Sequence, residues 1–437
     1  MNMDYVKIEN LLTPTKINFL WMMLANGIYA LCQWGMLIVL AKLGSPEIVG
    51  QFALGIAITA PVIMIANMQL RGVQATDARK EYFLADYMAV RIASTAVALL
   101  VILLILYLGH FSREVFFVTV ILTLAKAVES LSDVFYGFFQ QHEKMGFLAV
   151  SMIIKGISSV GVLAFIFYIS SSLRWALTGL FCVWLAVLVC YDVSRVRPLV
   201  KMTEGATHGD LLRSIVTAFS NRRKFLARMI LMAFPLGIVM GIISLNSNIP
   251  RYAIEKFLGA RDLGIFAALV YTTVAVNMFI LALGQAVAPK MSRCFATRDI
   301  PGFKSILNKM IVINLVIGLA GVLVISAGGK WILSLLYTAE YADYSNLFIL
   351  LMVCATVMGI ASAYGFAMTA ARQFKLQVPL FLVVLFSTAL ISYIFIPQFK
   401  LNGAALALLV SAGIQIGGSA LIVQREINRA VREGMSL

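Results

Sequence analysis

Long apolar runs recur from one end of the chain to the other, and no other feature of the sequence constrains its fold as strongly. Each run is long enough to cross a hydrocarbon core of about 30 Å as a helix, which takes roughly 20 residues. The sequence therefore predicts an all-α polytopic membrane protein. We expect twelve transmembrane helices, at residues 17–41, 48–70, 88–108, 115–139, 147–169, 175–194, 229–247, 262–286, 310–329, 346–371, 377–396 and 403–423.

Composition and charge agree with this fold class. Hydrophobic residues make up 61% of the chain and charged residues 13%, about half of the share expected in a soluble domain. A net charge of +15 is compatible with nucleic-acid binding, but in a polytopic protein it more often reflects basic cytoplasmic loops beside anionic lipid. The five cysteines and three histidines show no metal-ligand or disulfide spacing. The sequence predicts no nucleic-acid partner, no metal and no cofactor.

The distribution of Lys and Arg between alternate loops predicts the orientation. An even number of spans places both termini on one side, and the loops on that side carry most of the basic residues. Because positive loops stay in the cytoplasm, we expect both termini to be cytoplasmic, in a bacterial inner membrane.

The longest basic connection, 195–228, separates six predicted spans from six. The sequence thus predicts an N-terminal bundle at 1–194, a cytoplasmic linker at 195–228 and a C-terminal bundle with a short tail at 229–437. Residues 210–226 alternate apolar and basic positions at helical spacing, which indicates either an interfacial helix or a solvated basic linker.

The two halves resemble each other at two places. Leu43–Ala53 resembles Leu258–Ala267, and both segments form the turn between the first two helices of a bundle. Tyr136-Gly137-Phe138 near the end of the fourth span recurs as Tyr364-Gly365-Phe366 near the end of the tenth. These matches predict two six-helix bundles related by an internal repeat, as in many transporters.

Charged residues inside the predicted spans are the strongest functional signal. Lys126, Glu129 and Asp133 occur at i, i+3 and i+7 and so share one face of a helix. Lys155 in the next span lies at a similar depth. An intramembrane charge is costly, so these side chains must face protein or water, either as a structural ion-pair network or as a functional site. The equivalent positions of the second half are neutral, namely Cys354, Val357 and Ala361.

Other polar residues lie near the ends of spans. Asn67, Gln69 and Arg71 end the second span, and Arg251 follows the seventh at the outer face. Arg91 lies three residues inside the third span, and we expect its side chain to extend to the membrane interface.

The residues in four segments resemble a known family: Leu43–Phe52, Leu70–Ala78, Lys126–Gly137 and Asn248–Phe266. On these matches the chain is similar to the polysaccharide exporters of the Wzx or O-antigen flippase type, within the multidrug, oligosaccharidyl-lipid and polysaccharide (MOP) exporter superfamily. The resemblance covers nearly the whole chain. It implies a MATE-like, V-shaped pair of six-helix bundles around a central cavity, which alternates between inward-open and outward-open states.

The resemblance implies a flippase for polyprenyl-diphosphate-linked oligosaccharides in cell-surface polysaccharide synthesis, such as the O-antigen of lipopolysaccharide. Expected partners are this lipid-linked substrate, membrane lipid and enzymes of polysaccharide assembly. Cationic side chains suit the diphosphate, and aromatic and amide groups suit sugar hydroxyls. Carboxylates suit coupling to a proton or cation. The predicted substrate-binding residues are Arg71, Lys126, Lys155, Arg251, Asn67, Gln69 and Tyr136, and the predicted ion-coupling residues are Glu129 and Asp133.

Two alternatives remain open at this point. A drug or cation antiporter of the same fold would prefer an acidic and aromatic cavity. A membrane enzyme of glycan assembly would need a large outer loop with acid-base or nucleophilic residues, whereas the predicted outer loops are short. We therefore expect a transporter and not an enzyme.

Overall fold

The computed structural model describes residues 14–77, 80–204 and 210–435. Within these residues the chain is helical, and its contacts divide it into two compact units. Unit 1 comprises Met1–Gly44 and Gly55–Gly241, and unit 2 comprises Ser45–Leu54 and Ile242–Leu437. The division passes through two helices, α3 (Pro46–Asn67) and α11 (Arg223–Leu258).

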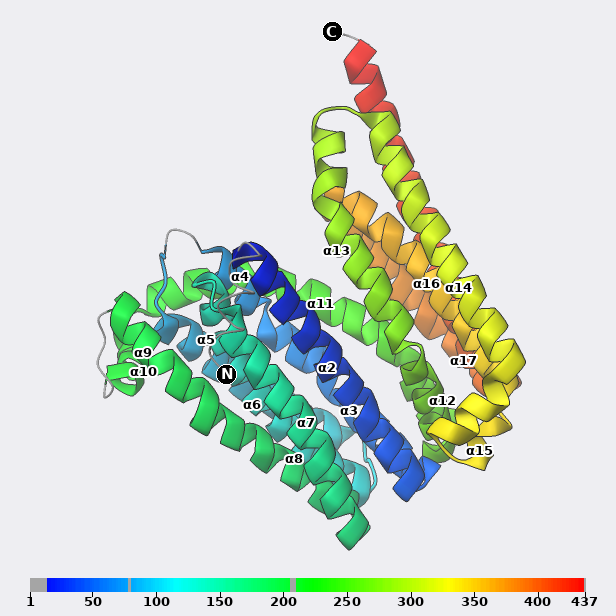
Figure 1. Cartoon of the computed structure of the whole chain (residues 1–437), viewed down its shortest axis with the longest axis horizontal. Helices are drawn as coiled ribbons and strands as arrows, with labels where there is room; N and C mark the ends of the chain where they lie inside the picture. The colour runs from blue at the N-terminus through cyan, green and yellow to red at the C-terminus, as the bar shows by residue number, and fades with distance from the viewer. Residues whose placement is uncertain (1–13, 78–79, 205–209, 436–437) are drawn as a thin grey trace, which may run out of the picture. The chain divides into compact units, whose positions relative to one another are not determined.

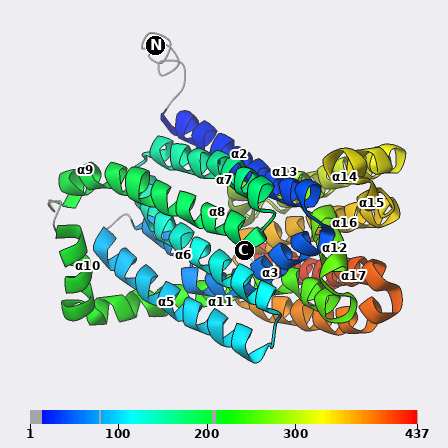
Figure 2. The same ribbon diagram turned by 90° about the horizontal axis from the view of Figure 1, so that it is seen from below.

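Unit 1 is a bundle in which neighbouring helices pack along their length. Figures 1 and 2 both show α7 between α2 and α8. Trp184 of α8 is buried and donates a hydrogen bond from its indole Nε1 to Ser159 Oγ of α7, at 2.7 Å. The helices of this unit are α2 (Pro14–Leu43), α3 from Gly55 onward, α4 (Leu70–Thr76), α5 (Leu84–Leu108), α6 (Arg113–Gln141), α7 (Met145–Ser170), α8 (Leu173–Val187), the π-helix η1 (Leu188–Asp192), α9 (Val193–Glu204), α10 (Asp210–Asn221) and the first part of α11.

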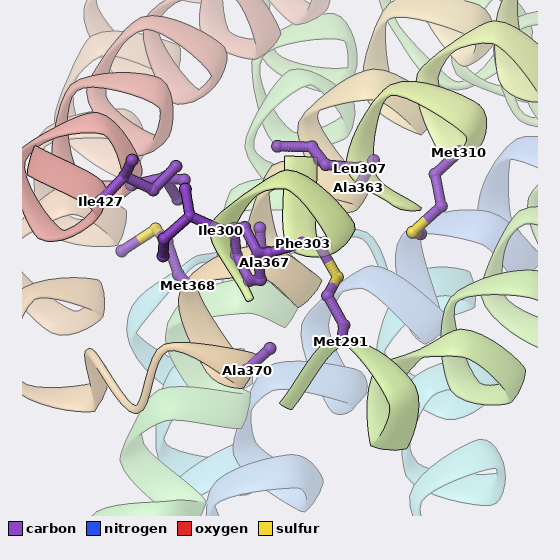
Figure 3. Packing of buried hydrophobic residues seen from close by; sticks show 11 residues of the cluster. Met291, Ile300, Phe303, Leu307, Met310, Ala363, Ala367, Met368, Ala370 and Ile427 are labelled. Atoms are coloured by element: carbon purple, nitrogen blue, oxygen red, sulfur yellow. The ribbon is translucent and has the colours of Figure 1, made fainter. Parts of the chain in front are cut away.

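Unit 2 contains the last part of α11, α12 (Ala260–Thr272), α13 (Val274–Ala296), α14 (Ile300–Leu336), α15 (Ala339–Ala342), α16 (Ser345–Ala370) and α17 (Phe374–Met435). Figure 3 shows one cluster of its core, in which Phe303 and Leu307 of α14 meet Ala363 and Ala367 of α16. The two alanines lie one turn apart on one face, so the helices approach closely without loss of packing.

The all-α polytopic fold is confirmed, with one difference in the number of spans. Ten helices among the described residues are long and apolar enough to cross a membrane, whereas the sequence predicted twelve. The predicted spans 377–396 and 403–423 both lie in α17, which holds two helices merged across a kink at Lys400, where φ is 52° and ψ is −134°. The predicted span 262–286 is divided between α12 and α13.

The region predicted as a linker contains α9 and α10. Helix α10 packs against α5, and the connection that follows it is tied to the same helix, because Arg222 Nη1 lies 2.5 Å from Asp86 Oδ2. The Asp86 carboxylate is buried and also accepts a hydrogen bond from the backbone N–H of Phe83. The predicted interfacial segment is thus helical over 210–221, and the residue after it forms an ion pair with a buried carboxylate.

The repeated turns pack against each other inside unit 2. Gly50 of α3 faces the first residue of α12, so that an added Cβ would lie 1.8 Å from the carbonyl oxygen of Ala260. Gly264 of α12 faces the first residue of α3, and its Cβ would lie 1.8 Å from the carbonyl oxygen of Pro46. The two glycines are equivalent in the sequence repeat, and their contacts are reciprocal. Such a self-complementary arrangement is typical of two-fold symmetry, which supports the internal repeat.

Candidate functional site

A cavity of about 450 Å³ lies within unit 1. Eight of the nine residues that the sequence singled out line it, and they come from α3, α4, α6, α7 and the turn before α4. These eight are Asn67, Gln69, Arg71, Lys126, Glu129, Asp133, Tyr136 and Lys155.

The ninth residue, Arg251, does not line this cavity. It lies in the part of α11 that belongs to unit 2, where its Nη1 donates to Asn248 Oδ1 at 3.0 Å. Its guanidinium also lies 5.8 Å from the centroid of the Tyr271 ring, within cation–π range. A role in substrate binding at Arg251 stays a prediction.

One face of α6 supplies most of the charge. Lys126 Nζ lies 2.7 Å from Glu129 Oε2 and 5.3 Å from the centroid of the Trp184 ring. The other carboxylate oxygen of Glu129 accepts a hydrogen bond of 2.5 Å from the Tyr29 hydroxyl of α2. The side chains of Lys126 and Glu129 stay 30% and 27% exposed, so both remain accessible from the cavity.

Two arginines hold Asp133. Arg71 Nη1 lies 3.5 Å from one carboxylate oxygen and Arg91 Nη2 lies 3.2 Å from the other. The expectation that Arg91 reaches the membrane interface is wrong, because its side chain is fully buried and also donates to Asn67 Oδ1. A buried guanidinium needs such partners, and two are available beside α5.

A turn between helices α3 and α4 places Arg71 in the cavity. Helix α3 ends at Asn67, and Met68 and Gln69 adopt positive φ angles of 48° and 52° before α4 begins. This left-handed conformation is uncommon for residues other than glycine and is often found at functional sites. The turn redirects the chain, and Arg71 then lies 5.7 Å from the centroid of the Tyr136 ring.

Lys155 pairs with a residue that the sequence analysis did not identify. Its Nζ lies 3.1 Å from Asp192 Oδ2, and the two side chains are 2% and 0% exposed. Asp192 is an acidic residue inside the predicted span 175–194, and this is the signal that could have identified it. Tyr29 and Ser132 are further partners that sequence reasoning missed; neither stands out by pattern, because each is joined to the site only by packing. Arg91 was identified as a charge inside a predicted span, but its pairing with Asp133 was not predicted.

The charges of the cavity favour anions. Among the lining residues and their buried ion-pair partners there are four cations, Arg71, Arg91, Lys126 and Lys155, and three carboxylates, Glu129, Asp133 and Asp192. Among the described residues, no group of His, Cys, Asp or Glu side chains is arranged to hold a metal ion.

A bundle of long apolar helices that encloses a polar, charged cavity defines a multi-pass membrane protein with a transporter-type fold. Solved structures agree on the fold. An inward-facing multidrug resistance MATE family transporter of the MOP superfamily is similar with a TM-score of 0.71 at 14% identity, covering 92% of this chain and 98% of that one. The lipid II flippase MurJ, in an inward closed conformation, is similar with a TM-score of 0.70 at 13% identity, covering 94% and 90%.

Sequence comparison is more specific. Residues 16–295 match the family described as polysaccharide biosynthesis protein, and the chain belongs to this family. A relative from Staphylococcus aureus, the capsular polysaccharide biosynthesis protein CapF, is 26% identical over 399 residues, which cover 90% of this chain and 95% of the relative.

Proposed function

We propose that this protein is a flippase that moves polyprenyl-diphosphate-linked oligosaccharides from the cytoplasmic to the outer leaflet of a bacterial cytoplasmic membrane. The substrate has a tail that stays in lipid and a head that is too polar to cross unaided. The family, the similarity to CapF and the fold shared with MurJ all support this proposal. We keep the O-antigen of lipopolysaccharide as the predicted glycan. Capsular polysaccharide, which appears in the name of the relative CapF, is the second candidate.

The observation that carries the proposal is the excess of one positive charge among the residues that line the cavity of unit 1 and their buried ion-pair partners. Arg71 and Lys126 are 27% and 30% exposed, so each has donors directed to the cavity side as well as a carboxylate partner. A guanidinium and an ammonium can both donate charge-assisted hydrogen bonds to a diphosphate. In the substrate the sugar follows the diphosphate, and in this proposal its hydroxyls face Asn67, Gln69 and Tyr136, which line the same cavity.

The transport cycle that we propose is alternating access coupled to an ion gradient, with Glu129 and Asp133 as the coupling carboxylates. Both are lined up on α6 beside the cations proposed to hold the substrate. Protonation or cation binding at either carboxylate would release its cation partner for the diphosphate, so the binding of the ion and the binding of the substrate would favour each other. No chemical bond is made or broken in this cycle, so we propose transport and not catalysis.

The same charge count argues against a drug or cation antiporter, which would require a net negative cavity. Binding to the purified protein tests this directly. We expect farnesyl diphosphate, a soluble polyprenyl diphosphate, to bind and tetraphenylphosphonium, an organic cation, not to compete. Arg71→Ala should weaken the binding of farnesyl diphosphate at least about tenfold, the loss of one charge-assisted hydrogen bond.

A matched control is available in the same unit. Arg174 forms an exposed ion pair with Glu114, far from the cavity lining, and Arg174→Ala should leave binding unchanged. Preferential binding of the organic cation, or equal effects of the two arginine variants, would overturn the proposed function. In cells with the chromosomal gene deleted, the intact gene should restore surface glycan and Arg71→Ala should not.

The proposed orientation has its own test. Single cysteines in place of Ser112, before α6, and Ser220, at the end of α10, should react differently with an impermeant thiol reagent added outside. We expect labelling at position 112 and protection at position 220, as both termini in the cytoplasm require. The reverse pattern would show that the chain is inserted with the opposite sidedness.

A further inference from the structure

The ion pair between Lys155 and Asp192 differs from the other charges of the cavity by its burial. The side chains of Arg71, Lys126, Glu129 and Asp133 are 27–30% exposed, whereas those of Lys155 and Asp192 are 2% and 0% exposed. Burying a charge is costly even when it is paired, so an ion pair this deep needs further hydrogen bonds to be stable.

All the donors of Lys155 are committed within the protein. An ammonium has three N–H groups. Lys155 Nζ donates to Ser132 Oγ, to the Tyr136 hydroxyl at 3.1 Å and to Asp192 Oδ2 at 3.1 Å. A ligand in the cavity therefore finds no free donor on Lys155, although the residue belongs to the cavity lining.

The hydrogen bonds around Asp192 have a defined direction. Ser151 donates its hydroxyl hydrogen to Asp192 Oδ1 at 2.5 Å. A serine hydroxyl has one hydrogen, so Ser151 Oγ must accept in its contact of 2.8 Å with the Tyr136 hydroxyl. Tyr136 thus donates to Ser151 and accepts from Lys155. Its single hydroxyl hydrogen is fixed, and the orientation of the ring is fixed with it.

A π-helical turn places Asp192 in this network. Residues Leu188–Asp192 form η1 between α8 and α9. A π turn holds one residue more than an α turn, and one residue corresponds to a rotation of about 100° around the helix axis. Such turns are rare and often found at functional sites. Here the turn ends on the carboxylate that faces Ser151 and Lys155 of α7.

We propose that Asp192 is a positioning residue of the substrate site. It balances Lys155 inside the bundle and, through Ser151, holds the Tyr136 ring in one orientation beside Arg71. Lys155 donates a hydrogen bond to the Tyr136 hydroxyl and does not contact the substrate. Arg71 and Lys126 are therefore the cations that bind the diphosphate. This inference rests on the proposed function and assigns separate roles to the three cations of the cavity.

Ser151 offers the sharpest test, because its hydroxyl links Asp192 to Tyr136 and carries no charge. We expect Ser151→Ala to fold normally and to weaken the binding of farnesyl diphosphate about three- to tenfold, the contribution of one hydrogen bond. Ser151→Thr keeps the hydroxyl and should restore affinity to within about twofold of the natural chain. Ser158 lies on the same helix and bonds only to carbonyls of that helix, so Ser158→Ala is the matched control and should have no effect.

The double variant Lys155→Met with Asp192→Asn removes both buried charges together, which avoids leaving one of them unpaired. Positioning predicts that it weakens binding by no more than about tenfold, as Ser151→Ala does. A loss of about 100-fold or more would show that Lys155 binds the ligand directly and would overturn the proposal. Unchanged affinity in Ser151→Ala, or no recovery in Ser151→Thr, would overturn it as well.

The outcomes also separate this proposal from the function on which it rests. Binding that depends on Arg71 but not on Ser151 would refute only the positioning role. Absence of farnesyl diphosphate binding by the natural chain would refute the proposed function and the positioning role with it.

Discussion

Helices α6 and α16 occupy corresponding places in the two halves of the chain, and both carry a Tyr-Gly-Phe tripeptide near their ends. On α6, the face above the tripeptide holds Lys126, Glu129 and Asp133, which line a cavity. On α16, the corresponding residues are neutral: the buried thiol of Cys354 donates to the carbonyl of Ala405 at 3.2 Å, and Ala361 is buried in the packing of unit 2. The shared helical fold therefore does not require the charges.

The glycines of the two tripeptides differ in the same way. An added Cβ at Gly137 would lie 2.3 Å from Gln74 Oε1 and 3.3 Å from the Cα of Arg71, so this glycine lets α4 approach α6. Among the residues that the structure describes, no atom outside the neighbouring backbone of α16 lies within 4 Å of an added Cβ at the equivalent Gly365. The same sequence motif thus supports a close contact beside the cavity in unit 1 and open space in unit 2. A repeat in sequence does not imply a repeat in function.

The largest effect is expected at Lys126. Lys126→Ala removes one of the two cations proposed to bind the diphosphate and leaves Glu129 without its cation partner, and we expect glycan export in cells to fall at least about 100-fold. Lys126→Arg should retain more export than Lys126→Gln, because a diphosphate requires positive charge. Cys354→Ala is the matched change on α16 and should leave export unchanged. Normal export by the Gln variant would remove Lys126 from the proposed site.

A double-mutant cycle distinguishes a transport role of the Lys126–Glu129 pair from charge balance alone on α6. The structure pairs Glu129 with Lys126, so the cycle combines Glu129→Gln with Lys126→Met and scores protein abundance and glycan export separately. Each single variant should lower abundance by leaving one charge unpaired, and the double variant should restore it. If either residue has a role in transport beyond charge balance, as substrate-binding cation or coupling carboxylate, export stays absent in the double variant. Recovery of export together with abundance would reduce the ion pair to structural support.

Where the two halves are equivalent in structure, the same substitution should have equal effects. Gly50→Ala and Gly264→Ala each place a methyl group against a backbone carbonyl, and we expect each to lower the free energy of unfolding by about 3 kcal/mol, the upper range for overpacking. Thermal unfolding of the purified protein in one detergent at one scan rate measures this. A marked difference between the two variants would contradict the reciprocal packing of the repeated turns.

The smallest effect is expected where the halves diverge in packing alone. Gly137→Ala crowds Gln74 and Arg71, and we expect a loss of about 1 kcal/mol after the gain in helix propensity is subtracted. Gly365→Ala meets no neighbour and should stabilise α16 by up to about 1 kcal/mol. Thermal unfolding of both variants gives the sign directly. If Gly137→Ala stabilised the protein as Gly365→Ala does, the close approach of α4 to α6 would not be rigid.

The location of the helices was largely predictable, whereas the charge partners were not. Each predicted span falls mainly on helical residues, although the span 48–70 includes the turn at Met68 and Gln69. The kink at Lys400 and the division at Thr273 changed the number of continuous helices. Lys155 was placed level with Glu129 and Asp133 by counting along the helices, yet its partner is Asp192. Residue counting gives depth in the membrane, and it does not give the rotation of each helix about its axis.

The sequence by itself determined the class of protein, the helical runs and the charged face of α6, because transfer into lipid and helical periodicity depend on local sequence. The tertiary structure decided which charges meet. Asp192 reaches Lys155 through the π turn, and Arg71 reaches Asp133 through the left-handed turn at Met68 and Gln69. Both turns are backbone features of low intrinsic stability that the surrounding packing maintains, so no local sequence pattern predicts them.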